Sequence, residues 1–280
     1  MRKYAGRRFT ALRDSLEFTV GNHKIILELY VSDEKSSKRD AVLIFPGGGY
    51  STVCHDHEGW PIATAYLERG VNAFVLHYAA GTEYRYPSHL TDASFAICYL
   101  KEHADELGID KDRIFTLGFS AGGHLSGSMA ILHSDESVLA ELGIKKGDNK
   151  PCGSILAYPV VSAMCDTHRE SFEYLTGKPF DTISEEEKRK YSLEMNVNED
   201  SSPLFIWHTS LDELVPMLGS LRLAEAYYNL GRHVSLHVYP YGTHGLSLAT
   251  ELTAKGNENW VQPLAAVWID QSVEWMKTVK

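Results

Sequence analysis

The chain has 280 residues, 44% of them hydrophobic, and a formal net charge of -10 at pH 7. This length and hydrophobic fraction are enough for one sizeable core, so we expect a single domain over residues 1–280. The negative charge argues against non-specific binding to nucleic acid or to anionic lipid, and it fits a protein that acts on neutral or cationic small molecules.

Strand-like and helix-like segments alternate along the chain. Several strand candidates are near-continuous apolar runs, typical of strands covered on both faces. The strand candidates span residues 24–31, 41–46, 72–78, 113–117, 153–158, 204–209 and 234–239. The helix candidates span residues 59–69, 90–107, 121–132, 216–230 and 260–277. This alternation predicts an α/β fold with a mostly parallel, twisted sheet and helices on both of its faces.

Two segments depart from the alternation. The first strands are joined by "VGNHK", which predicts an antiparallel hairpin at the sheet edge. Residues 162–202 then separate two strand candidates by about forty residues and include the polar run "TISEEEKRKYS". Connections of that length usually carry their own structure or a function. We expect a small helical insertion that forms a partial lid, with residues 185–190 on a solvated helix face.

The cysteines and the termini bear on location. Cys54, Cys98, Cys152 and Cys165 are widely spaced and form no C-x-x-C pair, which suits a reducing compartment. The N-terminal "MRKYAGRRFTALRD" has no apolar run after its charges, and no stretch approaches the length of a membrane span. We therefore expect a cytoplasmic protein without a signal peptide.

The stretch "TLGFSAGGHL" carries a G-x-S-x-G pattern centred on Ser120. It follows a strand candidate and opens a helix candidate, which is the context that a nucleophilic serine on a sharp strand-to-helix turn requires. A tight turn with an incidental serine is the alternative interpretation.

A serine needs a base to take its proton and an acid to orient that base. Asp212 follows the strand candidate "LFIWHT", and His244 follows "SLHVYP". The order Ser, Asp, His is the one found on this type of fold, and both loops lie at the carboxyl ends of parallel strands. Glu213 is the alternative acid.

The triplet Gly47, Gly48 and Gly49 follows the strand "VLIFP" and offers backbone N–H groups without side chains in the way. With the N–H of Ala121 at the start of the next helix, it predicts an oxyanion hole. A phosphate-binding loop is the rival interpretation, but no G-K-[ST] follows the triplet.

These motifs resemble the α/β-hydrolase family, in particular small bacterial esterases related to acetyl xylan esterases. The resemblance rests on "FPGGGYSTVCHDHEGWPIATAYLERGVNAFVLHY", "YPSHLTDASFAICYLKEHADELGIDKDRIFTLGFSAGGHL", "PLFIWHTSLDELVP" and "LHVYPYGTHGLSL", and it covers most of residues 40–248. It implies Ser120, Asp212 and His244 as the catalytic triad. It also implies the amides of Gly48, Gly49 and Ala121 as the oxyanion hole. Phe45 departs from the tyrosine that the family pattern has before its Pro-Gly-Gly-Gly.

Other residues invite a role with less support. Tyr50, Tyr158 and Pro159 follow strand ends, so an acyl or sugar pocket and ordinary rim packing are both open interpretations. The run "CHDHE" at residues 54–58 looks like a metal cluster, but five consecutive residues seldom converge on one ion. His124 is expected to pack against the core. We expect neither a metal nor a cofactor.

The leading hypothesis is a serine carboxylic ester hydrolase that removes short acyl groups from small esters. Acetyl groups on plant-derived sugars are what the resemblance suggests. A serine peptidase or amidase of the same fold and a non-catalytic binding protein are the alternatives. A homodimer through a sheet edge or through the last helix, with Trp260, Trp268 and Trp275, is plausible, although these tryptophans are equally suited to the core.

Overall fold

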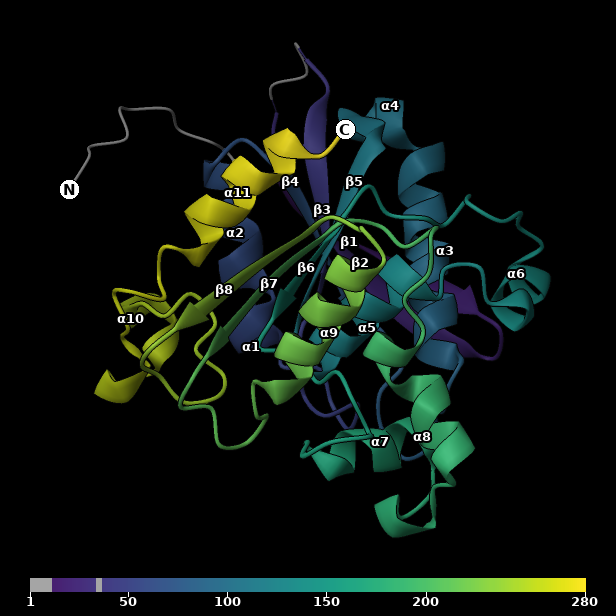
Figure 1. Cartoon of the computed structure of the whole chain (residues 1–280). Helices are drawn as coiled ribbons and strands as arrows, with labels where there is room; N and C mark the ends of the chain where they lie inside the picture. Colours follow the sequence, from purple (N-terminus) through teal and green to yellow (C-terminus); the bar gives the residue numbers. More distant parts are fainter. Residues whose placement is uncertain (1–11, 34–36) are drawn as a thin grey trace.

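The computed structural model describes residues 12–33 and 37–280, so most of the N-terminal segment considered for a signal peptide lies outside the described residues. The described chain forms one eight-stranded sheet in the order β1-β2-β4-β3-β5-β6-β7-β8 (Figure 1). β1 pairs with β2, and β2 with β4, in antiparallel fashion, and the other pairs are parallel. The strands are β1 (Leu12–Val20), β2 (His23–Val31), β3 (Arg39–Phe45), β4 (Asn72–His77), β5 (Ile109–Phe119), β6 (Ser154–Ala157), β7 (Leu204–Thr209) and β8 (Val234–Tyr239). The expected edge hairpin and the expected parallel sheet are both confirmed.

Helices cover both faces of the sheet (Figure 1). Along β3 the side chains alternate: Leu43 packs with α3 and α5, whereas Val42 and Ile44 pack with α2 and α11. α9 packs beside α5, against β6 and β7. The helices are α1 (His55–Glu58), α2 (Trp60–Glu68), α3 (Ser88–Glu102), α4 (Ala104–Leu107), α5 (Ala121–Ile131), α6 (Glu136–Leu142), α7 (Arg169–Thr176), α8 (Glu185–Tyr191), α9 (Leu218–Asn229), α10 (Glu251–Ala254) and α11 (Trp268–Thr278).

The last helix differs from the prediction. α11 begins at Trp268, whereas the periodicity of the sequence predicted a start at residue 260. Pro263 lies between the two positions, and proline disfavours helix in the residue before it and lacks an N–H. Trp260 instead ends a short 3₁₀ helix, Glu258–Trp260, and turns lead from there to α11.

α6 was missed by the sequence analysis although its caps are visible in the sequence. The Asp135 side chain accepts hydrogen bonds from the N–H groups of Ser137 and Val138, and Gly143 ends the helix in the left-handed conformation. An aspartate before a short apolar-periodic stretch and a glycine after it are start and stop signals.

Residues 162–202 form the expected helical insertion. It contains α7, α8 and the 3₁₀ helices Phe180–Thr182 and Leu193–Met195. α8 has no buried residue, as the charged run predicted, and starts with a capping box between Ser184 and Glu187. Phe172 and Leu175 of α7 pack into the core with α3 and α5, so the insertion is fastened to the sheet. Its role as a lid stays a prediction.

The C-terminal tryptophans belong to the interior. Trp268 is fully buried, stacked on Trp207 with ring centroids 5.3 Å apart. Trp260 and Trp275 are partly buried and pack against the same core cluster. The structure therefore favours the core interpretation of these residues over a role in a dimer interface.

The start of α5 is pressed against β3 and β5. A Cβ added at Gly118 would lie 1.8 Å from the carbonyl oxygen of Gly122, and one added at Gly122 would lie 2.1 Å from that of Phe45. Both contacts are with backbone, which cannot move aside as a flexible side chain can. The glycines thus set how closely the helix that follows Ser120 approaches the sheet.

We predict that Gly118→Ala lowers the free energy of unfolding by about 3 kcal/mol or more, because the added methyl group must displace backbone. The matched control is Gly143→Ala, where open space surrounds the added Cβ and only the positive φ of 63° opposes it. That control should cost about 1 kcal/mol. Urea unfolding of both variants measures the difference, and equal losses would contradict the close-approach argument.

Candidate active site

Ser120 lies on the turn between β5 and α5 with φ 53° and ψ -118°. Positive φ is uncommon for a residue with a side chain and persists where the surrounding structure enforces it. Here the close packing at Gly118 and Gly122 enforces it, and the Ser120 hydroxyl is held at the carboxyl edge of the sheet. The sequence predicted this strand-to-helix turn.

Ser120, His244 and Asp212 form one chain of hydrogen bonds. His244 Nδ1 lies 2.7 Å from Asp212 Oδ2, and His244 Nε2 lies 2.8 Å from Ser120 Oγ. Because an ionised carboxylate only accepts, Nδ1–H donates to Asp212 and leaves Nε2 to accept the Ser120 O–H. This tautomer is the one that can take a proton from the serine. Glu213, the alternative acid, is exposed to solvent instead.

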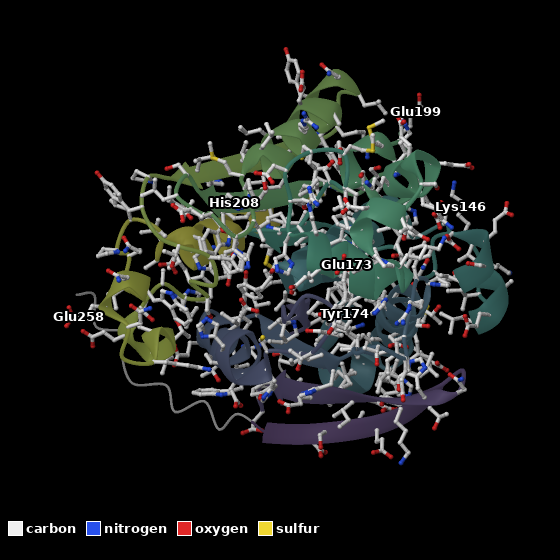
Figure 2. All side chains as sticks on the ribbon, turned by 90° about the horizontal axis from the view of Figure 1, so that it is seen from below. Lys146, Glu173, Tyr174, Glu199, His208 and Glu258 are labelled. Atoms are coloured by element: carbon white, nitrogen blue, oxygen red, sulfur yellow. The ribbon has the colours of Figure 1, made fainter. Side chains whose placement is uncertain are left out.

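Asp212 is held ionised within the protein. Its Oδ1 accepts the N–H groups of Leu214 and Val215. Its Oδ2 lies 3.3 Å from Nε2 of the buried strand residue His208, and the same nitrogen lies 2.8 Å from the Val215 carbonyl oxygen. His208 is labelled in Figure 2. Burial alone would raise the pKa of Asp212, but the hydrogen bonds from His208 and His244 hold it well below its usual range. The sequence analysis did not predict the contact between His208 and Asp212.

The glycine loop presents backbone donors beside Ser120. Gly48 and Gly49 have φ 128° and 65°, conformations that glycine adopts without strain. Within the described residues, the N–H groups of Gly48, Gly49 and Ala121 donate to no protein acceptor. The Gly47 N–H is used differently, because it donates to Glu58 Oε2 at 2.7 Å. The loop can therefore offer donors to an oxyanion, with Gly47 as its anchor.

The sequence analysis named Glu58 only as part of the run "CHDHE" and did not predict its role in holding the glycine loop. Glu58 is buried, at 4% exposure, and its Oε1 accepts the hydroxyl of Tyr158 at 2.6 Å. Burial, and then the Glu58 carboxylate, raise the pKa of Tyr158 well above its usual range, so this hydroxyl keeps its proton and donates. Glu58 thus joins the glycine loop to the residue that follows β6. A single glutamate in "CHDHEGWP" gives no sequence signal for such a role.

The loop that carries His244 is fastened to the same group of residues. The N–H of Ser247 donates to the Tyr158 hydroxyl oxygen at 3.0 Å, and His57 Nε2 lies 2.5 Å from the Gly245 carbonyl oxygen. The Tyr158 ring also packs edge-on against the His244 ring, with centroids 5.0 Å apart. α1, which supplies His57 and Glu58, therefore supports both the glycine loop and the histidine loop.

The structure does not support the substrate contacts considered for Tyr50, Tyr158 and Pro159. All three are buried, and none lines the cavity at Ser120. The Tyr50 hydroxyl bonds His124 Nδ1 at 2.8 Å, behind the glycine loop. His124 is buried as expected, and its Nε2 bonds the Tyr191 carbonyl oxygen. These aromatic side chains support the site from the interior because their polar ends find partners there.

A cavity of about 420 Å³ opens onto Ser120 and His244. One part of its wall comes from the insertion, and Tyr174 on α7 can be located in the view from below (Figure 2). Trp260, at the end of the 3₁₀ helix Glu258–Trp260, is part of the wall, and its ring is tilted by 40° to the His57 ring with centroids 5.0 Å apart. The lining beyond the glycine loop, Ser120 and His244 comprises Ser51, Cys54, His57, Glu58, His168, Glu170, Tyr174, Leu214, Gly245 and Trp260.

Solved structures with this fold include several hydrolases. An α/β hydrolase from a Medee basin deep-sea metagenome library superposes with a TM-score of 0.75 at 31% identity, over 95% of this chain and 98% of that one. An acetyl ester-xyloside bifunctional hydrolase from Caldicellulosiruptor lactoaceticus gives 0.77 at 29% identity, over 92% and 89%. A carboxylesterase from Lactobacillus plantarum WCFS1 gives 0.83 at 25% identity, over 95% and 97%. With the strand-to-helix turn at Ser120, these neighbours define the chain as an α/β hydrolase.

The chain belongs to the BD-FAE family, whose pattern matches residues 27–227. Endo-1,4-beta-xylanase B of Butyrivibrio fibrisolvens is 36% identical over 217 residues, which are 76% of this chain and 33% of that protein. Acetylxylan esterase of Xylanibacter ruminicola is 29% identical over 215 residues, 75% of this chain and 42% of that protein. The chain thus matches between a third and about two fifths of the length of these relatives. The resemblance inferred from the sequence is confirmed.

We predict that Glu58→Ala lowers kcat for ester hydrolysis roughly 100-fold, because the loop anchored at Gly47 loses its acceptor and shifts. Glu58→Gln should lose less, since an amide oxygen still accepts the Gly47 N–H. Steady-state kinetics would show the loss mainly in kcat, with KM changed little. The matched control is Glu68→Gln, an exposed carboxylate at the end of α2. An Ala variant as active as that control would contradict the anchoring role.

Proposed function

We propose that this protein is a serine carboxylic ester hydrolase that removes short acyl groups, foremost acetyl, from small polar esters. The observation that carries the proposal is the hydrogen-bonded chain Asp212–His244–Ser120 ending in the cavity beside the glycine loop. The proposal assigns these three residues as the catalytic triad. Relatives named as esterases support the reaction class.

In the acylation step, Ser120 Oγ attacks the carbonyl carbon of the ester while His244 Nε2 accepts its proton. Asp212 holds the ring in this tautomer and stabilises the imidazolium that forms. The carbonyl oxygen becomes an oxyanion, which accepts hydrogen bonds from the N–H groups of Gly48, Gly49 and Ala121. Removing one such donor typically raises the activation free energy by roughly 3–4 kcal/mol.

His244 then donates the proton to the leaving alcohol, and an ester of Ser120 remains. In the second half-reaction a water molecule attacks this acyl group while His244 again acts as the base. The acid leaves, and the proton returns to Ser120. The same oxyanion donors serve both steps, so no cofactor enters the proposed mechanism.

The cavity wall favours a polar alcohol as the leaving group. Imidazoles of His57 and His168 and the carboxylate of Glu170 lie on it together with the aromatic Trp260. An aromatic face beside polar groups suits a sugar ring, whose surface is part apolar and part hydroxyl. The names acetylxylan esterase and acetyl ester-xyloside hydrolase among the similar proteins point the same way. We therefore propose acetylated sugars as the substrate class.

The test compares p-nitrophenyl acetate, butyrate and octanoate with the wild-type protein and with Ser120→Ala, followed by acetate release from acetylated xylo-oligosaccharides. We expect kcat/KM to fall with acyl length and Ser120→Ala to reduce kcat by about 10⁴-fold or more. Ser137→Ala, an exposed serine on α6, is the matched control and should retain full activity.

If Ser120→Ala releases nitrophenol as fast as the wild type, the assignment of the triad is wrong. Absence of esterase activity, with hydrolysis of an amide by the same protein, would replace the proposal by a peptidase or amidase. Acetate release from nitrophenyl acetate but not from the oligosaccharides would exclude acetylated sugars as the substrate class, while the assignment as an esterase would stand.

Two wider proposals complete the functional assignment. A homodimer would use a sheet edge, β1 or β8, because the tryptophans considered for an interface pack in the core. Sedimentation equilibrium should then give twice the monomer mass.

A cytoplasmic location is proposed from four cysteines that are all free, and localisation of a tagged full-length chain tests it. In the described residues, no helix has the length and apolarity needed to cross a bilayer.

A further inference from the structure

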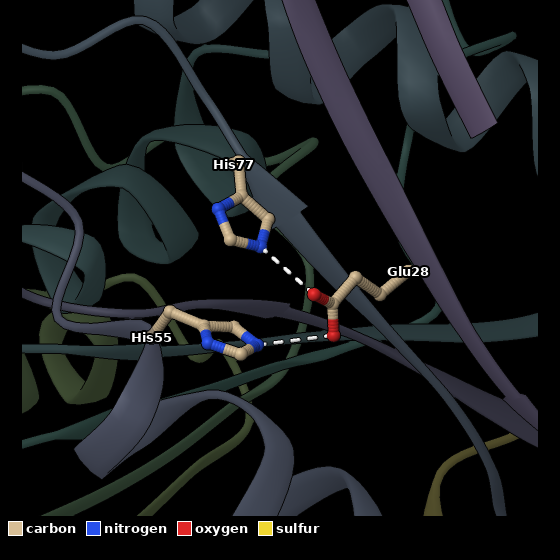
Figure 3. A group of neighbouring side chains, drawn as sticks. All are labelled: Glu28, His55 and His77. Carbon is tan, nitrogen blue, oxygen red and sulfur yellow. Dashed lines mark hydrogen bonds and ion pairs between the residues drawn. The ribbon is translucent and has the colours of Figure 1, made fainter. Parts of the chain in front are cut away.

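Two histidines and one glutamate converge beside α1. Figure 3 shows the rings of His55 and His77 pointing at the two carboxylate oxygens of Glu28. We propose that these three side chains form a binding site for a divalent transition-metal ion of the zinc class. The proposal is independent of the ester hydrolysis proposed above.

The residues come from three separate elements. Glu28 lies in β2, His77 is the last residue of β4, and His55 opens α1. The sequence analysis noted that the five consecutive residues of "CHDHE" seldom converge on one ion by themselves. The run supplies only His55 here, and the other two ligands come from neighbouring antiparallel strands. Such convergence from distant parts of the chain is what a metal site requires.

The distances fit a common central ion. His55 Nε2 lies 3.0 Å from Glu28 Oε2, His77 Nε2 lies 3.3 Å from Glu28 Oε1, and the candidate ligand atoms all lie within 4.8 Å of one another. Ligand atoms bound about 2.1 Å from a tetrahedral zinc ion are about 3.4 Å apart. The two measured separations are close to that edge length, so small ring movements complete the geometry.

A plain hydrogen-bonded cluster is the alternative to a metal site for the same side chains. Each histidine would then have to carry its proton on Nε2, and the His77 contact of 3.3 Å is longer than the usual range for such a bond. With an ion between them, both Nε2 lone pairs and the carboxylate point at one charge. Two imidazoles and one carboxylate are ligands that zinc, cobalt and iron share.

The surroundings support the ligands as they do in metal sites. The Tyr30 hydroxyl donates to Glu28 Oε2 at 2.6 Å, and the Asp56 carboxylate lies 3.4 Å from the far nitrogen of His55. Outer groups of this kind fix carboxylate and ring orientation. The side chains are 10% exposed for Glu28, 16% for His55 and 28% for His77, so the cluster lies close to the protein surface.

The ion would be distinct from the catalytic residues yet mechanically connected to them. None of the three ligands lines the cavity at Ser120. His55 is, however, the first residue of the one-turn helix that also carries His57 and Glu58, which hold the histidine loop and the glycine loop. A bound ion would tie that helix to β2 and β4.

The test uses the full chain, freed of any affinity tag and stripped of metal with a chelator. We expect cobalt to bind with one equivalent per chain and to give the visible absorption of a low-coordinate ion, which zinc abolishes by competition. His55→Gln and His77→Gln should each lose at least 100-fold in affinity. Tyr30→Phe, which keeps the buried ring, should lose roughly tenfold.

Two control variants locate the ion. His233→Gln removes the histidine that directly precedes β8, at the edge of the sheet opposite β1. His244→Ala removes the candidate catalytic base. Both variants should bind cobalt as the wild type does. Circular dichroism of the metal-free variants checks folding, and Tyr30→Phe keeps the test decisive where a histidine variant fails to fold. Absence of cobalt absorption in the wild type, binding retained in both His55→Gln and His77→Gln, or binding lost in His244→Ala would each overturn the proposal.

Discussion

The arrangement of the site depends on the hydrogen bonds that the buried carboxylate of Glu58 accepts. A carboxylate out of water needs strong donors, and Glu58 has the Gly47 N–H and the Tyr158 hydroxyl. Tyr158 in turn accepts the N–H of Ser247 and packs against the His244 ring. One acidic group therefore sets the separation between the loop that would bind the oxyanion and the loop that carries the base. Removing it would leave two donors buried without an acceptor.

The sequence predicted those parts of the structure that local chemistry determines. The turn at Ser120 needs small neighbours, and Asp212 and His244 each directly follow a strand that ends at the same edge of the parallel sheet, so both features are visible in a single chain. Glu58 acts through Tyr158, which is a hundred residues away in sequence, and no local pattern marks such a contact. His208 is only four residues from Asp212, but nothing in the strand "LFIWHT" distinguishes a histidine that contacts the acid from one that packs in the core. The predicted start of α11 at residue 260 was wrong because Pro263 interrupts the helical pattern, and the helix begins only at Trp268.

The β5–α5 side of the site is closely packed, whereas the opposite wall of the cavity lies on surface segments. All eleven residues of α5 are buried, and backbone contacts hold its first turn against β3 and β5. The far wall of the cavity comes from side chains on the surface segments, such as His168, Tyr174 and Trp260. Ser120 and Ala121 thus lie on the packed β5–α5 turn, whereas the wall that would meet the leaving alcohol in the proposed reaction lies on connections, where variation costs the fold little.

The placement of residues 162–202 has a consequence for how such a protein can diversify. The segment leaves the sheet after β6 and returns at β7, and these two strands are hydrogen-bonded neighbours in parallel register. Its two ends are thus fixed by one pair of adjacent strands, whatever lies between them. A segment of different length or composition would change the wall of the cavity without moving the turn at Ser120, provided that it replaces the core contacts of Phe172 and Leu175.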